Sequence, residues 1–136
     1  MRWYLDASVA LHAVLPGGDK RARRWLDAVR ANGDEVFSST LLHLELTRVL
    51  RRERLDPELA RPLIERISQA GIDDGVLRFA AAIERHVKSL DAIHLATCAL
   101  LGVGVTVATH DSAMGEAASA MGLDTFDPLG DDAGPR

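Results

Sequence analysis

Cysteine and long apolar runs are scarce in this sequence of 136 residues. Its one cysteine, Cys98, cannot form an internal disulfide. No apolar stretch approaches the roughly 18–20 residues that a membrane-spanning helix needs, and the first residues lack the charged, apolar and small-residue order of a secretory signal peptide. These absences predict a soluble protein of the cytoplasm that makes no contact with a membrane.

Several catalytic motifs are missing as well. The segment His43-Leu44-Glu45 contains the His-x-Glu of zinc deaminases, but a single cysteine rules out the Pro-Cys-x-x-Cys that accompanies it. The sequence has no His-Glu-x-x-His and no Gly-x-x-x-x-Gly-Lys. Gly102-Val103-Gly104 lacks the rest of a dinucleotide fingerprint, and we interpret it as the end of a helix. Zinc-dependent deamination and a nucleotide phosphate loop are therefore excluded.

A strongly basic surface is also absent. The 20 acidic residues outnumber the 16 lysines and arginines, and the net charge of −4 argues against a coat for duplex nucleic acid. The basic residues nevertheless gather in two places, 20–24 and 48–54. Each cluster is either a solvated helix face or, together with the other, a surface for the phosphates of a short single strand.

Apolar periodicity alternates between short strands and amphipathic helices along a chain whose length fits one domain. The predicted strands are 2–5, 35–38, 105–109 and 123–126, the last at a sheet edge. The predicted helices are 8–15, 19–31, 39–54, 56–71, 75–84, 88–101 and 112–121, and residues 72–74 fit either a short strand or a loop. Strands that alternate with helices predict a parallel α/β sheet, whose ligands bind outside the carboxyl ends of the strands.

Four acidic residues stand in unusual positions. Asp6 and Asp111 follow predicted strands, Glu45 lies on an apolar helix stripe, and Asp91 heads the buried stripe of another helix. Taken singly, each has an ordinary explanation: strand-end aspartates serve turns and caps, and the helix dipole favours Asp91 in a first turn that Ser89 caps. Gathered at one edge, four carboxylates would repel each other unless a proton or a cation intervenes. Oxygen-only ligands suit Mg²⁺ or Mn²⁺, so the set predicts a hard divalent metal site.

At these same segments the sequence resembles the PIN-domain ribonucleases, and among them the VapC-type toxins of toxin–antitoxin pairs. The matching segments are 4–8 (Tyr-Leu-Asp-Ala-Ser), 38–46, 90–96 (Leu-Asp-Ala-Ile-His-Leu-Ala) and 109–111 (Thr-His-Asp), and 90–96 is the most specific. The resemblance implies an α/β fold, a three-layer sandwich with a central, mostly parallel sheet of four to five strands flanked by helices. We expect a single PIN-like nuclease domain over residues 1–128 and a disordered tail over 129–136.

The resemblance also implies a metal-dependent endoribonuclease. Asp6, Asp91 and Asp111 would bind Mg²⁺ or Mn²⁺, and Glu45 would bind it directly or through water. Metal-activated water, rather than the ribose 2′-hydroxyl, would cut RNA and leave 5′-phosphate and 3′-hydroxyl ends. The family further implies an inhibitory antitoxin as partner and a homodimer.

Three polar residues beside these carboxylates have two interpretations each. Ser8 and Thr109 either orient metal ligands through hydrogen bonds or serve as a helix cap and a strand-end hydroxyl. His94 lies three residues after Asp91, so it either approaches the site or is a solvent-facing or hydrogen-bonded histidine. Cys98, on the apolar side of the same helix, is interpreted as a small buried thiol.

Two alternative functions remain open at this stage. One is a PIN-fold nucleic-acid-binding module or housekeeping nuclease that is not paired with an antitoxin, and the intact set of four acids argues against binding without hydrolysis. The other is a phospho-accepting signalling domain. Such a domain would need an aspartate after a central strand, but residues 50–56 are predicted as the end of a helix and a loop, so this alternative ranks last.

Overall fold

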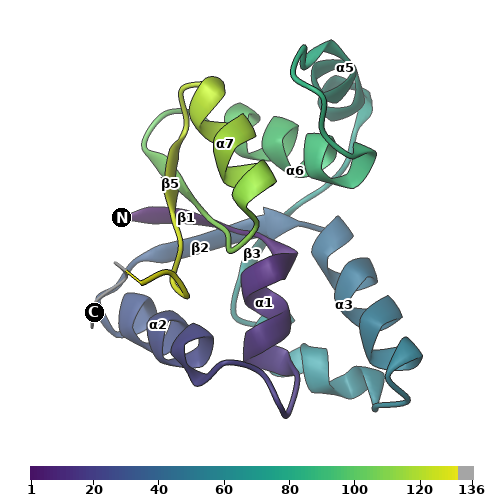
Figure 1. Ribbon diagram of the computed structural model, residues 1–136, viewed down its shortest axis with the longest axis vertical. Helices are drawn as coiled ribbons and strands as arrows, with labels where there is room; N and C mark the ends of the chain where they lie inside the picture. The colour runs from purple at the N-terminus through teal and green to yellow at the C-terminus, as the bar shows by residue number, and fades with distance from the viewer. Residues whose placement is uncertain (132–136) are drawn as a thin grey trace.

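Five parallel strands form the centre of the computed structural model, which describes residues 1–131 (Figure 1). The spatial order of the strands is β3-β2-β1-β4-β5, so β1 is the central strand and β3 and β5 are the edges. Their bounds are Arg2–Leu5 for β1, Glu35–Ser39 for β2, Ser68–Ala70 for β3, Val105–Ala108 for β4 and Asp124–Phe126 for β5. This arrangement confirms the predicted parallel sheet and the prediction of an edge strand near the carboxyl end of the domain.

Helices cover both faces of the sheet. In Figure 1, α1, α2 and α3 lie on one side of it and α5, α6 and α7 on the other. The helices are α1 (Ala7–Val14), α2 (Lys20–Ala31), α3 (Leu41–Arg52), α4 (Arg61–Ile64), α5 (Asp74–Ala82), α6 (Ser89–Leu100) and α7 (Ser112–Ala120), with a 3-10 helix, η1 (Pro57–Ala60), before α4. The predicted three-layer sandwich is therefore confirmed.

The side chains of β1 divide the apolar core into two parts. Successive residues of a strand point to opposite faces of a sheet. Trp3 and Leu5 therefore pack into the cluster with α1, α2 and α3, whereas Tyr4 packs into the cluster with α6 and α7. All three side chains are at most 1% exposed. The side chains of this one short strand thus contribute to the apolar core on both faces of the sheet.

The apolar spacing of residues 56–71 predicts a single helix, and this prediction is wrong. The segment forms η1 and the four-residue α4, and then the edge strand β3, which pairs in parallel with β2 through Phe37 and Ser68. Pro57 and Pro62 each lie at the start of a helix, where proline is tolerated, so each favours a new start rather than a continuing helix. The ladder with β2 then outweighs the helical preference of the residues that follow. Residues 71–73, by contrast, lie outside any helix or strand, and α5 begins at Asp74.

Two helices begin one or two residues away from their predicted caps. The residue that caps α1 is Asp6, whose backbone is extended like the strand before it, and Ser8 lies inside the helix. Lys88 occupies the capping position of α6, and Ser89 is the first helical residue. Neither Asp6 nor Lys88 makes a capping hydrogen bond through its side chain. The carboxylate of Asp6 is consequently used for other contacts.

The chain remains packed beyond the last strand. Leu129 is 3% exposed and belongs to the cluster with α1, α2 and α3, and its N–H donates to Asp127 Oδ1 over 2.8 Å. Of the tail predicted at 129–136, residues 132–136 lie outside the described residues. Within residues 1–131, no helix is long and apolar enough to cross a membrane.

Candidate active site

Four carboxylates come from four elements and approach the carboxyl edge of the sheet. Asp6 follows β1, and Asp111 lies just beyond the neighbouring strand β4. Asp91 lies in the first turn of α6, and Glu45 lies in α3. Because α3 and α6 pack on opposite faces, the acids reach this edge from both layers. The structure thus brings all four residues of the predicted set to one end of the sheet.

The charges of these residues act on one another. Asp91 is half-buried, and its burial is the main reason why its pKa lies above the usual range. The negative charges of Asp6 and Asp111 raise this pKa further, Glu45 adds a smaller effect of the same sign, and His94 acts in the opposite direction. The site is therefore a cluster of like charge that a cation would stabilise.

Two hydroxyl groups hold the buried carboxylate of Asp6, which is 4% exposed. Its Oδ2 atom accepts hydrogen bonds from Ser8 Oγ over 2.7 Å and from Thr109 Oγ1 over 2.8 Å. Each hydroxyl in turn accepts a backbone N–H, that of His110 at Ser8 and that of Asp111 at Thr109. Since a hydroxyl has a single proton to donate, these backbone contacts leave that proton for Asp6. Ser8 and Thr109 are therefore placed to orient this carboxylate.

Asp111 lies at the amino-terminal end of α7 and is exposed. Its Oδ1 atom accepts the backbone N–H of Ala113 over 2.9 Å and that of Met114 over 3.3 Å. A carboxylate at this position caps the helix and benefits from the helix dipole. The structure therefore assigns Asp111 the ordinary capping role that the sequence allows, and this role uses only one of its two oxygens.

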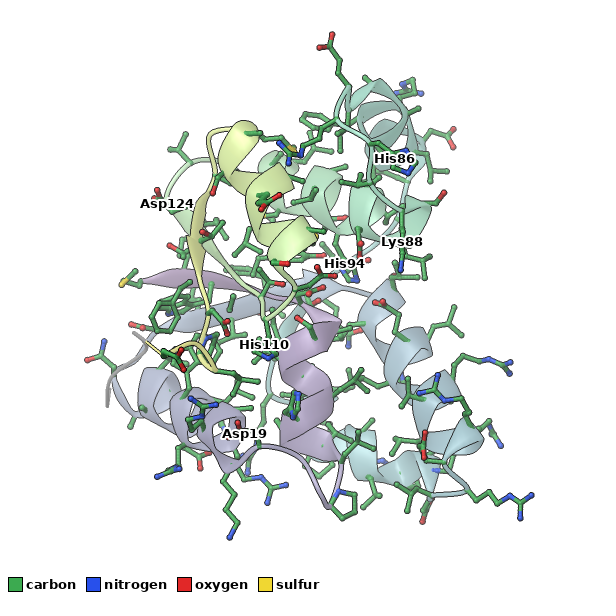
Figure 2. The ribbon with its side chains drawn as sticks, viewed as in Figure 1. Asp19, His86, Lys88, His94, His110 and Asp124 are labelled. Atoms are coloured by element: carbon green, nitrogen blue, oxygen red, sulfur yellow. The ribbon has the colours of Figure 1, made fainter. Side chains whose placement is uncertain are left out.

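Glu45 is joined to a buried histidine. Its Oε1 atom lies 2.5 Å from Nε2 of His94, and Nδ1 of His94 lies 2.6 Å from the hydroxyl of Tyr4. The side chain of His94 is 0% exposed and lies between α6 and α3 in the view of Figure 2. His94 is therefore hydrogen-bonded and not solvent-facing, and through Glu45 it also approaches the acidic cluster, so the two interpretations that the sequence offered are both partly met.

Sequence reasoning missed the link between His94 and Tyr4, although a signal for it exists. The alternation of β1 turns Tyr4 away from Trp3 and Leu5 and towards α6. A buried tyrosine hydroxyl needs a hydrogen-bond partner. His94 is the histidine on α6, the helix that packs over Tyr4.

The donor set fits a hard divalent cation by its chemistry. It consists of carboxylate oxygens with two supporting hydroxyls, the ligands that Mg²⁺ and Mn²⁺ prefer. In the part of the chain that the structure describes, no three His, Cys, Asp or Glu side chains are placed so that they already form a metal site. The carboxylates therefore form a negatively charged cluster rather than a finished coordination shell.

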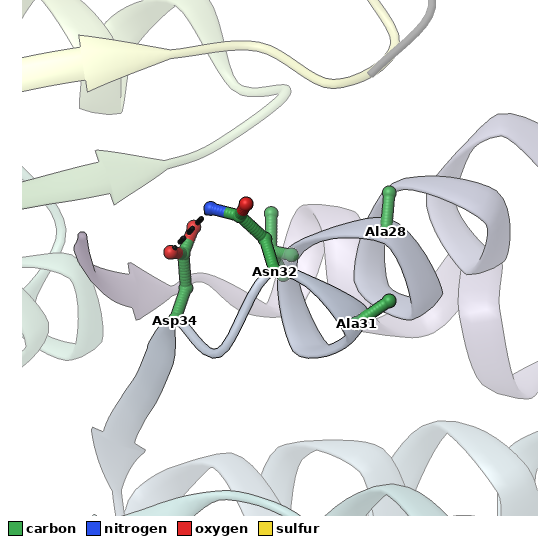
Figure 3. A pocket seen from close by; sticks show the side chains of 5 residues that line it. Ala28, Ala31, Asn32 and Asp34 are labelled. Atoms are coloured by element: carbon green, nitrogen blue, oxygen red, sulfur yellow. Dashed lines mark hydrogen bonds between the residues drawn. The ribbon is translucent and has the colours of Figure 1, made fainter.

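A hollow of about 500 Å³ lies elsewhere, at the carboxyl end of α2 (Figure 3). Asn32 and Asp34 line it, and the Asn32 amide donates to Asp34 over 2.9 Å. Asp34 directly precedes β2, so this hollow lies at the amino edge of the parallel sheet. It is thus at the opposite end of the strands from the four carboxylates.

Comparison with known proteins gives one family. A family model for the PIN domain matches residues 3–120. Ribonuclease VapC47 from Mycobacterium tuberculosis (strain CDC 1551 / Oshkosh) is 29% identical over 130 residues, which cover 92% of this chain and 96% of the relative.

Solved structures of other proteins also resemble this fold. The structure of FitAB bound to an IR36 DNA fragment superposes with a TM-score of 0.71 at 20% identity and covers 93% of this chain and 94% of that chain. The structure of VapBC2 from Rickettsia felis bound to a DNA fragment from their promoter gives a TM-score of 0.69 at 11% identity, over 93% and 98% of the two chains. At these identities the likeness shows the fold.

Proposed function

This chain belongs to the PIN-domain family, and from that premise we propose that it is a VapC-type endoribonuclease, the toxin of a toxin–antitoxin pair. The observation that carries the proposal is the approach of Asp6, Glu45, Asp91 and Asp111 to one sheet edge, where the other three charges raise the pKa of Asp91. The similarity to a ribonuclease over nearly the whole of both chains supports the same activity.

Asp6, Asp91 and Asp111 are the proposed metal ligands, with Glu45 as a ligand directly or through water. When bound, Mg²⁺ or Mn²⁺ supplies Lewis acidity that activates water and offsets the negative charge of the phosphate. Ser8 and Thr109 keep Asp6 in one orientation through the hydrogen bonds to its Oδ2 atom. Attack by water, rather than by the ribose 2′-hydroxyl, leaves 5′-phosphate and 3′-hydroxyl ends.

The RNA strand is proposed to reach this site along exposed basic residues. The two basic clusters of the sequence lie on α2 and at the end of α3, and their lysine and arginine side chains are exposed. Helix α3 carries both Glu45 and Arg48, so phosphate contacts and the acidic site share one helix. Phosphate contacts of this kind weaken as the salt concentration rises.

A cognate antitoxin is the proposed partner, and the chain is proposed to form a homodimer. The support is the fold of FitAB and VapBC2, which were both solved with DNA. A small reading frame for a DNA-binding protein beside the gene, whose product suppresses cleavage when the two proteins are mixed, would support this pairing. Full cleavage in the presence of that product would contradict it and favour a PIN nuclease without an antitoxin.

The activity itself is tested with pure protein and structured RNAs in Mg²⁺ or Mn²⁺. We expect cleavage that EDTA abolishes and that Asp91→Asn lowers by about a hundredfold or more, because even residues that only orient metal ligands contribute 10–100-fold. Asp27→Asn, at an exposed aspartate of α2, is the matched control and should cleave like the wild type. Cleavage that survives both EDTA and Asp91→Asn, or that leaves 2′,3′-cyclic phosphate ends, would refute the metal mechanism.

A further inference from the structure

Two buried side chains and one partly buried side chain connect the central strand to both helical layers at the edge of the acidic cluster. Tyr4 lies on β1, His94 on α6 and Glu45 on α3. The Tyr4 hydroxyl lies 2.6 Å from His94 Nδ1, and His94 Nε2 lies 2.5 Å from Glu45 Oε1. Tyr4 and His94 are both 0% exposed, whereas the side chain of Glu45 is 18% exposed. The chain of contacts therefore runs from the core towards solvent.

The direction of these hydrogen bonds follows from the number of protons available. The Tyr4 hydroxyl is fully buried and lies 2.6 Å from His94 Nδ1, so its single proton is donated to that nitrogen. With Nδ1 as acceptor, the single ring proton of His94 is on Nε2, and it is donated to Glu45 Oε1. Tyr4 thus selects the tautomer of His94 that can hold the carboxylate.

We propose that Tyr4 and His94 are positioning residues for Glu45 in the metal-dependent reaction. They fix one oxygen of Glu45, Oε1, by a hydrogen bond from inside the core and leave Oε2 for the acidic cluster. The inference rests on the proposed function, since it assigns the two residues a role in a site whose metal chemistry is itself proposed.

Glu45 needs such support because of where it lies. It reaches the site from α3, on the opposite face of the sheet from α6, and a free glutamate side chain has several rotamers at the mouth of the site. The bond to His94 ties it to the helix that carries Asp91. Hydrogen-bond partners of this kind orient metal ligands in proteins and commonly contribute 10–100-fold to metal affinity.

The decisive experiment measures Mn²⁺ binding by isothermal titration calorimetry on the full chain. The variants are Tyr4→Phe, which removes a single oxygen atom, His94→Gln, whose amide can still donate to Glu45, His94→Ala, which removes that donor, and Glu45→Gln. Trp3→Phe is the matched control, because it removes a partly buried hydrogen bond from the same strand, and that bond ends on Asp34 at the amino edge of the sheet, the opposite end from the acidic cluster. Circular dichroism and thermal unfolding identify any variant that does not fold.

We expect Tyr4→Phe to weaken Mn²⁺ binding by about 10-fold and His94→Ala by more, with His94→Gln in between and Trp3→Phe unchanged. Glu45→Gln should weaken binding too, and adding Tyr4→Phe to it should have little further effect. The proposal is overturned if Tyr4→Phe and His94→Gln bind Mn²⁺ like the wild type while Glu45→Gln does not, or if Glu45→Gln itself binds normally.

A second measurement separates this inference from the proposed function. The ¹⁵N chemical shifts of the His94 ring in metal-free protein should show a proton on Nε2 and none on Nδ1, and Tyr4→Phe should produce a mixture of tautomers. A wild-type protein that neither binds Mn²⁺ nor cuts RNA refutes the proposed function, while the expected ring shifts still support the hydrogen bonds from Tyr4 to His94 and from His94 to Glu45. A wild-type His94 ring protonated on Nδ1 refutes these hydrogen-bond directions, and with them the positioning role, even if RNA is cut.

Discussion

Asp91 carries the electrostatic strain of the site. It occupies the first turn of α6, where the helix dipole favours a negative charge, yet its pKa lies above the usual range, first through burial and then through the charges of Asp6 and Asp111. The unfavourable effects therefore outweigh the favourable one. In metal-free protein the charged carboxylate of Asp91 lowers the stability of the fold. A bound cation would offset the negative charges that cause this.

Asp91→Asn should therefore raise the stability of metal-free protein by a few degrees in Tm. A carboxyl group whose folded-state pKa is raised stabilises the fold below its unfolded pKa and loses this contribution as pH rises through the folded value. The advantage of Asn over Asp should thus grow from pH 4 to pH 7 in urea unfolding with EDTA. Saturating Mn²⁺ should reverse the order. An advantage that stays constant with pH would argue against charge as its cause.

Thr109 supports two groups of the site at once. Its hydroxyl donates to the buried Asp6 carboxylate over 2.8 Å and accepts the backbone N–H of Asp111 over 3.1 Å. Thr109→Val keeps the shape and removes both bonds, so it should destabilise the protein by about 1–3 kcal/mol in urea unfolding. Thr125→Val, at an exposed position of β5, is the control and should change stability little. An equal effect of the two substitutions would show that the hydroxyl of Thr109 has no special role.

At the level of elements, the connection between α1 and α2 depends on one glycine. A Cβ atom built at Gly18 would lie 2.0 Å from the backbone oxygen of His12, whereas one built at Gly17 would meet nothing within 4 Å. The loop therefore folds back against the end of α1 at Gly18 and is open at Gly17.

This contrast predicts that Gly18→Ala destabilises the protein by about 1–3 kcal/mol, the usual range for forcing atoms into a packed region. Gly17→Ala should be tolerated. Chemical denaturation of the two variants gives the comparison, with the same residue change one position apart. Similar midpoints for both would mean that the loop moves aside without cost.

Asp34 fastens β1 to the turn between α2 and β2. Its pKa is lowered to about 2, chiefly by the hydrogen bond from the Trp3 indole over 2.9 Å and then by the Met1 amino group, with Asn32 contributing less (Figure 3). Its side chain is 2% exposed. The charged carboxylate is thus stabilised by donors from two elements that are distant in sequence.

Asp34→Asn should therefore lower stability in a pH-dependent way. A lowered folded-state pKa contributes stability above the unfolded value of 3.8, and this contribution is lost as pH falls through about 2. The wild type should exceed the variant in the free energy of unfolding by a constant amount at pH 5–7, and the difference should shrink from pH 4 to pH 2. A difference that is equally large at pH 2 would contradict this account.

At the scale of the whole molecule, metal binding at the site should change how often the protein unfolds, and a buried thiol in the core can report this. Cys98 is 0% exposed in the cluster of α6 and α7, and burial raises the pKa of its thiol to about 12. The thiolate is the reactive form, so the thiol should react with a disulfide reagent only when the protein opens. Its labelling rate therefore reports the stability of the whole fold.

Mn²⁺ at about 100 times its Kd should slow the labelling of Cys98 by about 100-fold, since a ligand that binds only folded protein stabilises it by RT ln(1 + [L]/Kd). Asp91→Asn should show no such slowing, and Mg²⁺ should act like Mn²⁺ in the wild type. Labelling that is fast in native protein, or that Mn²⁺ leaves unchanged at saturation, would contradict the coupling.

The layers of this fold could be predicted from local patterns. The β-branched residues of 105–109 and the apolar stripe that includes Leu42 and Leu46 are local patterns, and each predicted the right kind of element. The strand differs from its alternating pattern in being buried along its whole length. The strand at 68–70 could not be predicted, because its residues are exposed or half-buried and its strand state depends on pairing with β2. A pairing between distant segments leaves no local period.

The parallel α/β order and the four acids could be recognised without the structure, because the chemistry of a residue and its place after a strand or on a helix are local properties. The contacts that Asp6 makes with Thr109 and Glu45 makes with His94, by contrast, depend on the tertiary structure. Asp111 became a helix cap, Asp6 the acceptor of two hydroxyls, and Glu45 the partner of His94. The cap of Asp111 is local and could be expected from the sequence. The bonds of Glu45 to His94 and of Asp6 to Thr109 join residues 49 and 103 positions apart, so they form only when the sheet brings its strand ends and both helical layers together.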